Sequence, residues 1–206
     1  MESTKEKVSY CIGLETGKNL KHQFADMDLK FLQEGLEDGV SESSPKLSGD
    51  EIRSILIALR NQVENQQKQY IAQMAQDNKK QGDDFLAENK TKEGVVSLPS
   101  GLQYKVIRSG TSGQKPNLFD NITIHYKGSL INGTVFDSSY DRGEPAVFPL
   151  HKLIAGWSEA LQLMQIGVKW QLFVPSYLAY GEHGFGPEIG PNSTLLFDVE
   201  LININK

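Results

Sequence analysis

The sequence has little of what several protein classes depend on. Of its 206 residues only Cys11 is a cysteine, so no disulfide can form within the chain. No apolar run approaches the roughly 20 residues of a membrane span, and the opening MESTKEKVSY has no apolar core of a signal peptide. The cytoplasm is therefore the expected location. A periplasmic or cell-surface location is the alternative if a leader was removed from this sequence.

Positive charge and the common catalytic motifs are also scarce. The formal net charge is -5, which gives no electrostatic footprint for nucleic acid. The four histidines show no metal-ligand spacing, and no G-x-S-x-G elbow is present. The glycine-rich segment 180–191 lacks the G-K-[S/T] ending of a phosphate loop. We expect no metal and no cofactor.

Proline is almost missing from the first half of the chain. Pro45 is the only proline before position 99, and the other seven of the eight follow. Both tryptophans also lie in the second half. This asymmetry predicts an α+β protein with three parts: a helical module over residues 1–47, a long connecting helix over 48–91, and a β-rich domain over 92–206.

Three helices fit the N-terminal half. Apolar residues from Val8 to Phe24 form one face, and Leu29 to Val40 form a second stripe behind Asp28 as N-cap. Ser48 and Glu51 are spaced as a capping box, after which no proline occurs until Pro99. The third helix is expected from about Gly49 to about Asn89, a length of about 60 Å.

The middle of this long helix is polar almost all round, which is typical of a solvated bridge between domains. A coiled coil is the alternative, although the heptads fade after Val63. Gly82 is expected to be a weak point, because glycine costs about 1 kcal/mol relative to alanine in a helix.

Residues 1–47 are too few to bury a core alone. Their apolar stripes must face something, so we expect this region to form a homodimer through its helices. The alternative is a monomer whose short helices fold back on the apolar stripe between Ile52 and Val63.

The C-terminal half alternates short strands with turns. Ile122, Ile124 and Tyr126 alternate with polar residues, and Asn132-Gly133 is a strong hairpin signal. GWSEALQLM has helical spacing. These patterns predict a mostly antiparallel sheet with one short helix on one face.

The segment 124–163 predicts an apolar pocket with a few polar groups, the usual form of a small-ligand or peptide site. Its aromatic residues surround Asp137, a buried-looking acid that needs a partner, with Arg142 and Tyr126 as candidates. Alternatively, Asp137 only ties a turn. Tyr180, Phe185 and Ile189 lie in a loop that either overhangs the site or is an ordinary surface loop.

Five ordered motifs, YKGSLINGTVFDSS, RGEPAVF, IAGWSEAL, LAYGEHG and GPNSTLLFDVEL, resemble the FK506-binding family of peptidyl-prolyl isomerases. SYCIGLETGKNL and the long helix resemble the bacterial branch of macrophage infectivity potentiators and FKBP22-type proteins. This resemblance implies a V-shaped homodimer with intertwined N-terminal modules. It also implies an isomerase that acts on proline-containing peptides and unfolded chains.

The resemblance carries the family pocket onto twelve positions. Asp137, Tyr126 and Tyr180 would have catalytic roles. The substrate-binding residues would be Phe136, Arg142, Phe148, Leu153, Ile154, Trp157, Phe185, Ile189 and Phe197.

The family's best-known member differs from this chain at four positions. It has phenylalanine at Ala146, an acid at Lys152, isoleucine at Glu188 and histidine at Phe185. These changes spare the pocket floor and the acid. They bear on sequence preference and on the affinity for macrolides such as FK506 and rapamycin, which the resemblance makes candidate ligands.

The absence of a nucleophile fits this activity, because rotation about an X–Pro bond breaks no covalent bond. A dry apolar pocket favours the twisted amide, which has lost its resonance charge separation, over the planar one. The rival interpretation is a dimeric chaperone clamp in which isomerisation is incidental. A hydrolase that uses Asp137 is disfavoured, because no second carboxylate is expected beside it.

Overall fold

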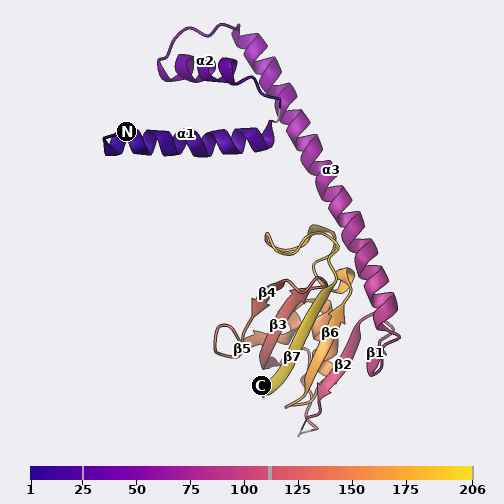
Figure 1. The fold of residues 1–206 in the computed structure, drawn as a ribbon. Helices are drawn as coiled ribbons and strands as arrows, with labels where there is room; N and C mark the ends of the chain where they lie inside the picture. Colours follow the sequence, from indigo (N-terminus) through magenta and orange to yellow (C-terminus); the bar gives the residue numbers. More distant parts are fainter. Residues whose placement is uncertain (25, 111–112, 206) are drawn as a thin grey trace. The chain divides into compact units, whose positions relative to one another are not determined.

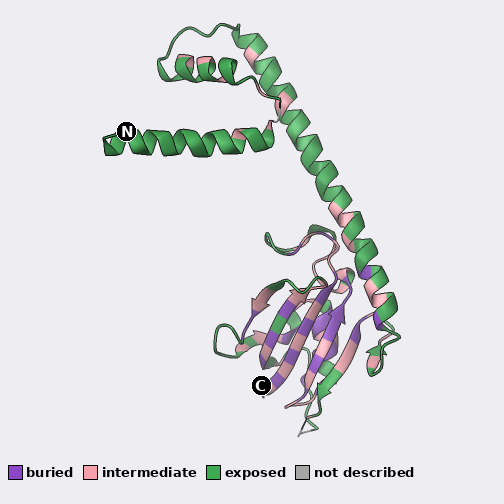
Figure 2. Cartoon of the chain, viewed as in Figure 1, coloured by how far each residue is buried: buried purple, intermediate pink, exposed green. Residues whose placement is uncertain are grey.

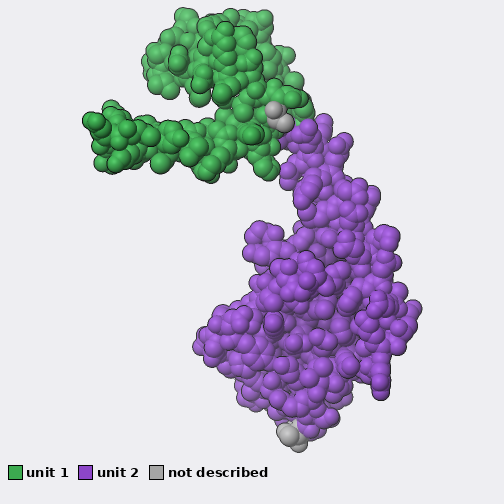
Figure 3. Space-filling model, viewed as in Figure 1, with its two compact units in different colours: residues 1–62 green, residues 63–206 purple. Residues whose placement is uncertain are grey.

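The computed structural model describes residues 1–24, 26–110 and 113–205. The chain forms two compact units, residues 1–62 and 63–206, and each is described by itself (Figure 3). Figure 1 gives the order of the elements along the chain. The three-part division expected from the sequence remains a prediction.

The first unit is helical. It contains α1 (Thr4–Gln23), α2 (Leu29–Val40) and the start of α3 (Gly49–Asn89). The predicted caps are confirmed: Asp28 Oδ1 accepts from the amide of Lys30 at 2.9 Å. Ser48 and Glu51 form the reciprocal bonds of a capping box, at 3.3 and 2.9 Å. The polar residues before each apolar stripe therefore fix where these two helices begin.

The first unit has no buried residue among its described positions (Figure 2). Apolar side chains stay exposed on all three helices. Helices of this length derive most of their stability in proteins from tertiary packing of an apolar face. This unit therefore lacks, within one chain, the burial that normally stabilises such helices.

The second unit is built on one antiparallel sheet. Its strand order is β1-β2-β6-β7-β3-β4, and β5 also pairs with β3. The long central pairs β3·β7 and β6·β7 carry the middle of the sheet (Figure 1). The strands are β1 (Val95–Ser97), β2 (Gln103–Arg108), β3 (Asn121–Leu130), β4 (Val135–Ser138), β5 (Ala146–Pro149), β6 (Lys169–Val174) and β7 (Leu195–Asn205).

The core of this unit lies between the sheet and α4 (Ala155–Leu163). Ile122, Ile124 and Tyr126 of β3 are buried at alternate positions, as their spacing predicted. Ala160 and Leu161 of α4 are fully buried in the same cluster. The predicted fold class, helices followed by an antiparallel sheet with one short α-helix, is confirmed.

Three single-turn helices complete the unit. They are η1 (Leu150–Lys152), η2 (Ser176–Leu178) and η3 (Gly181–His183). The predicted hairpin turn is present between β3 and β4, where the amide of Gly133 donates to Leu130 O at 2.9 Å and Gly133 has a φ of 88°.

The last part of α3 belongs to the second unit. The expected solvated helix holds for residues 61–73, which are exposed throughout, and is wrong from Met74 onward, where one face is partly or fully buried. Near its end, buried Asn89 donates from Nδ2 to Gln103 Oε1, and Gln103 Nε2 donates to Leu86 O, both at 2.9 Å. These bonds join α3 to β2.

Candidate active site

A cavity of about 230 Å³ opens beside α4. Its walls come from β3, β4, β5, β7, the start of α4 and the segment after η2. All of its lining residues were among the predicted site residues: Tyr126, Phe136, Asp137, Phe148, Leu153, Ile154, Trp157, Tyr180 and Phe197. Residues that are far apart in the sequence therefore meet in one place.

The sheet register brings two phenylalanines together at one wall. Gly128 of β3 pairs with Phe197 of β7 on one side and with Asp137 of β4 on the other. A Cβ atom at Gly128 would lie 2.6 Å from the Phe136 ring and 2.8 Å from the Phe197 ring. Because glycine has no side chain, the two rings meet edge to face, 5.7 Å between centroids.

Trp157 forms the base of the cavity from the first turn of α4, and it is almost fully buried. Tyr126 and Phe197 contact it edge to face, with centroid separations of 5.2 and 5.0 Å. Within the described residues the indole N–H has no hydrogen-bond partner. The base is thus a large aromatic surface held by two other aromatic rings.

Asp137 lies at the rim, and both of its carboxylate oxygens are engaged. Oδ2 accepts a 2.5 Å hydrogen bond from the Tyr126 hydroxyl. Oδ1 accepts from Nη1 of Arg142, while Nη2 of the same guanidinium donates to the Tyr126 hydroxyl at 2.8 Å. The three side chains form a closed polar ring, so Asp137 is not an unpartnered acid. Both predicted partners are confirmed.

These contacts shift the pKa values in opposite directions. Partial burial acts to raise the pKa of Asp137, but the hydrogen bonds from Tyr126 and Arg142 outweigh it and lower the pKa below its usual value. Burial, followed by the bond to Asp137, raises the pKa of Tyr126. Burial and the charge of Asp137 raise the pKa of Tyr180. These shifts keep Asp137 charged and both phenols, Tyr126 and Tyr180, neutral at neutral pH.

The expectation of a buried acid is wrong. The side chain of Asp137 is 42% exposed and that of Arg142 is 47% exposed. An ion pair this open contributes little to folding stability. Its main effect is geometric, because it fixes the direction of the Tyr126 hydroxyl.

Sequence reasoning missed Ser139, which is fully buried. Its hydroxyl accepts from the amide of Tyr126 at 2.8 Å and donates to the carbonyl of the same residue at 3.2 Å. The hydroxyl thereby fixes the backbone that carries the Tyr126 side chain. Nothing in the run FDSSYD distinguishes Ser139 from a surface serine, so no sequence signal would have found it.

The loop after β6 contributes only part of what was expected. Tyr180 lines the cavity, and the Phe185 ring stacks on it at 4.8 Å between centroids. Phe185 is 63% exposed, whereas Ile189 is buried. Among the described residues that line the cavity, neither of these two occurs. Phe185 supports Tyr180 from outside the cavity, and the backbone of Ile189 pairs with that of Phe185.

Besides the indole N–H of Trp157, two hydrogen-bond donors at the cavity have no partner within the described part of the chain. They are the hydroxyl of Tyr180 and the backbone amide of Ile154, which is the N-cap residue of α4. Both residues line the cavity. An extended peptide in the cavity would find these two donors for its carbonyl groups.

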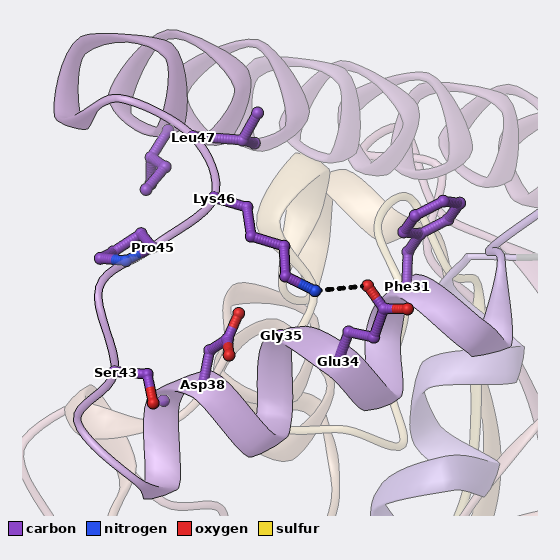
Figure 4. A pocket seen from close by; sticks show the side chains of 10 residues that line it. Phe31, Glu34, Gly35, Asp38, Ser43, Pro45, Lys46 and Leu47 are labelled. Carbon is purple, nitrogen blue, oxygen red and sulfur yellow. Dashed lines mark hydrogen bonds and ion pairs between the residues drawn. The ribbon is translucent and has the colours of Figure 1, made fainter.

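The first unit holds a larger cavity of about 560 Å³ between α2 and the start of α3 (Figure 4). Phe31, Leu47 and Ile52 contribute apolar walls. Lys46 donates to Glu34 at 2.7 Å inside it. Ser43 and Asp38 also line it, so its lining is mixed, with apolar walls and several polar side chains.

Residues 1–24, 26–110 and 113–205 contain neither a metal-binding cluster nor a membrane-spanning helix. No three His, Cys, Asp or Glu side chains come together as a metal site would need. In the same residues, no helix has the length and apolar character to cross a membrane.

Comparisons with known proteins match the whole chain. Residues 112–202 match the model of FKBP-type peptidyl-prolyl cis-trans isomerases. Residues 5–106 match the domain amino-terminal to such isomerases. A crystal structure of FkpA from Escherichia coli superposes with a TM-score of 0.80 at 36% identity, covering 100% of this chain and 98% of that one.

Full-length relatives agree. "Outer membrane protein MIP" of Legionella longbeachae is 44% identical over 100% of this chain and 88% of its own length. The FKBP-type 22 kDa peptidyl-prolyl cis-trans isomerase of Escherichia coli K12 is 42% identical over 98% of this chain and 97% of its own. Identity of 42% and 44% over at least 98% of the chain shows the family. The chain belongs to the FKBP-type peptidyl-prolyl cis-trans isomerase family and is an enzyme of that activity.

Proposed function

We propose that the cavity floored by Trp157 is where the X–Pro bond rotates. The observation that carries this proposal is the combination of an aromatic cavity with an acid whose two oxygens already accept hydrogen bonds from Tyr126 and Arg142. Such a site is suited to a reaction that needs shape and polarity and no proton transfer.

The chemistry follows from amide resonance. A planar peptide bond has a rotation barrier of about 18–20 kcal/mol, which comes from partial double-bond character. Twisting the bond removes this character and with it the charge separation of the amide. An apolar enclosure stabilises the twisted form relative to the planar one, which is differential binding of the transition state.

Each polar group then has a defined task. The proline ring of the substrate lies over Trp157. The Tyr180 hydroxyl and the Ile154 amide hold the carbonyl groups on either side. Asp137 and Arg142 act through Tyr126, whose hydroxyl and ring they hold in place. Asp137 is therefore a positioning residue in this proposal, since its oxygens face Tyr126 and Arg142.

A pair of tryptophans tests the location of the site. Trp157→Leu should raise KM for a prolyl tetrapeptide at least about tenfold, which corresponds to about 1.4 kcal/mol of lost binding. Trp170→Leu is the matched control, because Trp170 is also buried but stacks on Tyr104 away from the cavity. Equal KM changes in the two variants would contradict the proposal.

A double-mutant cycle tests the role of Asp137. Asp137→Ala should lower kcat/KM substantially with little unfolding, and Arg142→Ala should lower it as well. If both act through Tyr126, the double variant should lose little more than the worse single one, because residues in one network are not additive. Independent, additive losses would mean that Asp137 acts on the substrate directly. Unchanged turnover in Asp137→Ala would remove it from the mechanism.

We further propose that the first unit makes the protein a homodimer that holds unfolded clients. Supporting this, no described residue of that unit is buried, although apolar side chains such as Phe31, Ile55 and Leu56 are exposed. The cavity between α2 and α3 offers an apolar surface for a second copy (Figure 4). Two linked sites raise the effective affinity for a long chain with several prolines.

A charge placed on the apolar face tests the dimer. Leu56→Asp should give a monomer in sedimentation, leave tetrapeptide turnover within about twofold, and reduce catalysis of a proline-limited refolding reaction by about tenfold or more. Asn61→Asp adds the same charge at an exposed polar position of α3 and should change nothing. A wild-type monomer at micromolar concentration, or undiminished refolding catalysis by Leu56→Asp, would contradict the clamp.

Two sequence-based expectations stay predictions. The predicted location is the cytoplasm, and the periplasm or cell surface is the alternative. The name of the Legionella relative, an outer membrane protein, is in line with the alternative. Macrolides of the FK506 and rapamycin type remain candidate ligands of the same cavity, with Ala146, Lys152 and Glu188 as the positions expected to tune their affinity.

A further inference from the structure

The loop that carries Tyr180 is bound from behind by the last part of α3. Asn78 of α3 donates from Nδ2 to the carbonyl of Pro191 at 2.9 Å. In the reverse direction, Asn192 donates from Nδ2 to the carbonyl of Ala75 at 3.3 Å. Two side-chain amides therefore cross between the helix and the loop, and each satisfies a backbone carbonyl of the other element.

One turn further along α3, the helix also makes a close steric contact with the segment that precedes β7. Gly82 is buried, and a Cβ atom there would lie 2.3 Å from Oγ1 of Thr194, which is itself buried. Glycine is less favourable than alanine inside a helix. At this position it permits an approach that every other residue would prevent.

The loop carries this attachment toward the cavity. The backbone amide of Asn192 donates to the carbonyl of Gly181 at 2.8 Å, and Gly181 directly follows Tyr180. Asn192 has a φ of 55°, in the left-handed region that asparagine tolerates better than most residues. The residue that contacts α3 through its side chain thus fixes the segment next to Tyr180 through its backbone.

We propose that Asn78, Gly82, Asn192 and Thr194 form a helix–loop clamp that positions the Tyr180 hydroxyl over the cavity. These four are positioning residues, since none of them lines the cavity. The proposal rests on the function proposed above for the cavity. It adds that the long helix, beyond connecting two units, helps to shape the substrate site.

The placement of Tyr180 depends on its backbone to an unusual degree. Within the described residues its hydroxyl makes no hydrogen bond, and its ring stacks on a largely exposed Phe185. A displacement of about 1 Å at a site residue can cost a large factor in rate or binding. Releasing the loop from α3 should therefore weaken substrate binding.

The first test removes the side-chain hydrogen bonds that Asn78 and Asn192 make between the helix and the loop, in the full-length protein. In Asn78→Ala/Asn192→Gly, glycine keeps the positive φ and the amide bond to Gly181 while the side chain is lost. We expect KM for a prolyl tetrapeptide to rise at least about fivefold with kcat within about twofold, the pattern of lost uniform binding. Lys80→Ala, an exposed substitution on the same helix, is the control and should leave both constants unchanged.

The second test moves the helix and the loop apart without removing a hydrogen-bonding group from either. Gly82→Ala should raise KM in the same way, although alanine favours the helix itself. Adding Thr194→Ala removes the atom at 2.3 Å and should return KM toward the wild-type value. A merely structural role would lower the stability of Gly82→Ala but leave the KM of the folded enzyme unchanged, so there would be no change in KM to rescue.

Amide hydrogen exchange separates failure of the clamp from failure of the proposed cavity. The Asn192 amide should exchange at least about tenfold faster in Asn78→Ala than in the wild type, as expected when a local opening becomes easier. Unchanged exchange, or faster exchange with unchanged KM while Trp157→Leu still raises KM, overturns the clamp alone. If Trp157→Leu leaves KM unchanged, the cavity is not the substrate site, and the proposed role of the clamp fails as well.

Discussion

The two units of this chain differ in how much of their apolar surface they bury. The second unit buries a continuous cluster between its sheet and α4, with Leu161, Leu172 and Leu201 fully inaccessible. The first unit buries none of its described residues and leaves Phe31, Ile55 and other apolar side chains exposed. Within one chain, therefore, the second unit has a core of its own, and the described residues of the first unit form none.

This difference separates two kinds of stability. A unit with its own core unfolds with a free energy that does not depend on protein concentration. A unit that completes its burial against a second copy has a stability that rises with concentration. The comparison can therefore be tested by substitutions of similar chemistry in the two units.

The largest effect should come from truncating a leucine in each unit. Leu161→Ala should lower the free energy of unfolding of the second unit by about 2–5 kcal/mol at every protein concentration, because it leaves a cavity in a closed core. Leu36→Ala, at a position 52% exposed in one chain, should have an effect only at concentrations where a dimer forms. Urea titrations at several concentrations measure both.

The tryptophans make these two responses separable. Trp157 and Trp170 both belong to the second unit, so their fluorescence follows that unit, while far-ultraviolet circular dichroism also follows the helices of the first. If Leu36→Ala lowered the free energy of unfolding equally at all protein concentrations, the first unit would have a core of its own. The contrast between the two units would then be wrong.

A smaller effect is expected at the start of α3. Ser48→Ala removes the cap and should cost about 1 kcal/mol of helix stability, seen as a loss of helical signal on mild heating. Ser54→Ala is the matched control, because the same substitution inside the helix replaces serine by a better helix former. Equal losses at the two positions would deny the cap any specific role.

The smallest effect concerns pH. The folded protein lowers the pKa of Asp137, so the stability this group contributes is present above its unfolded value of about 3.9 and is lost as pH falls through the folded one. For Tyr126 and Tyr180 the pKa is raised, so their contribution is present below about pH 10 and is lost at higher pH.

Between these limits kcat/KM should vary by less than about twofold from about pH 5 to pH 9. Asp137→Asn should abolish part of the acid-induced loss of stability, whereas Asp141→Asn, at an exposed neighbour outside the ring, should not. A clear inflection in kcat/KM near neutral pH would contradict a mechanism without proton transfer.

Helix ends and the cavity were predictable because their signals are local or carried by ordered motifs. Asp28, and Ser48 with Glu51, fix the starts of α2 and α3 through bonds that span two or three residues. Period-two burial in β3 follows from alternating side chains. Most of the expected site residues line the cavity.

What failed depends on contacts that have no local signature. Asn78 and Gly82 lie on a face of α3 that the sequence predicts to be polar and solvated. A glycine there predicts a less stable helix, and only the structure shows that it permits close packing against Thr194. The exposure of Asp137 was misjudged because adjacency to Phe136 says nothing about how far a rim opens to solvent. Ser139 acts through the backbone of Tyr126, a long-range pairing.

The boundary between the units at residues 62 and 63 falls inside α3, which continues through it without a loop. A protease needs several residues of unwound chain, and a continuous helix offers them only by opening. Residues 61–73 are exposed to solvent, but their helical conformation protects them from cleavage. The rate at which a protease cuts there would therefore report how often this part of the helix unfolds locally. Limited digestion should release an intact second unit slowly, and helix-stabilising substitutions in that stretch should slow it further.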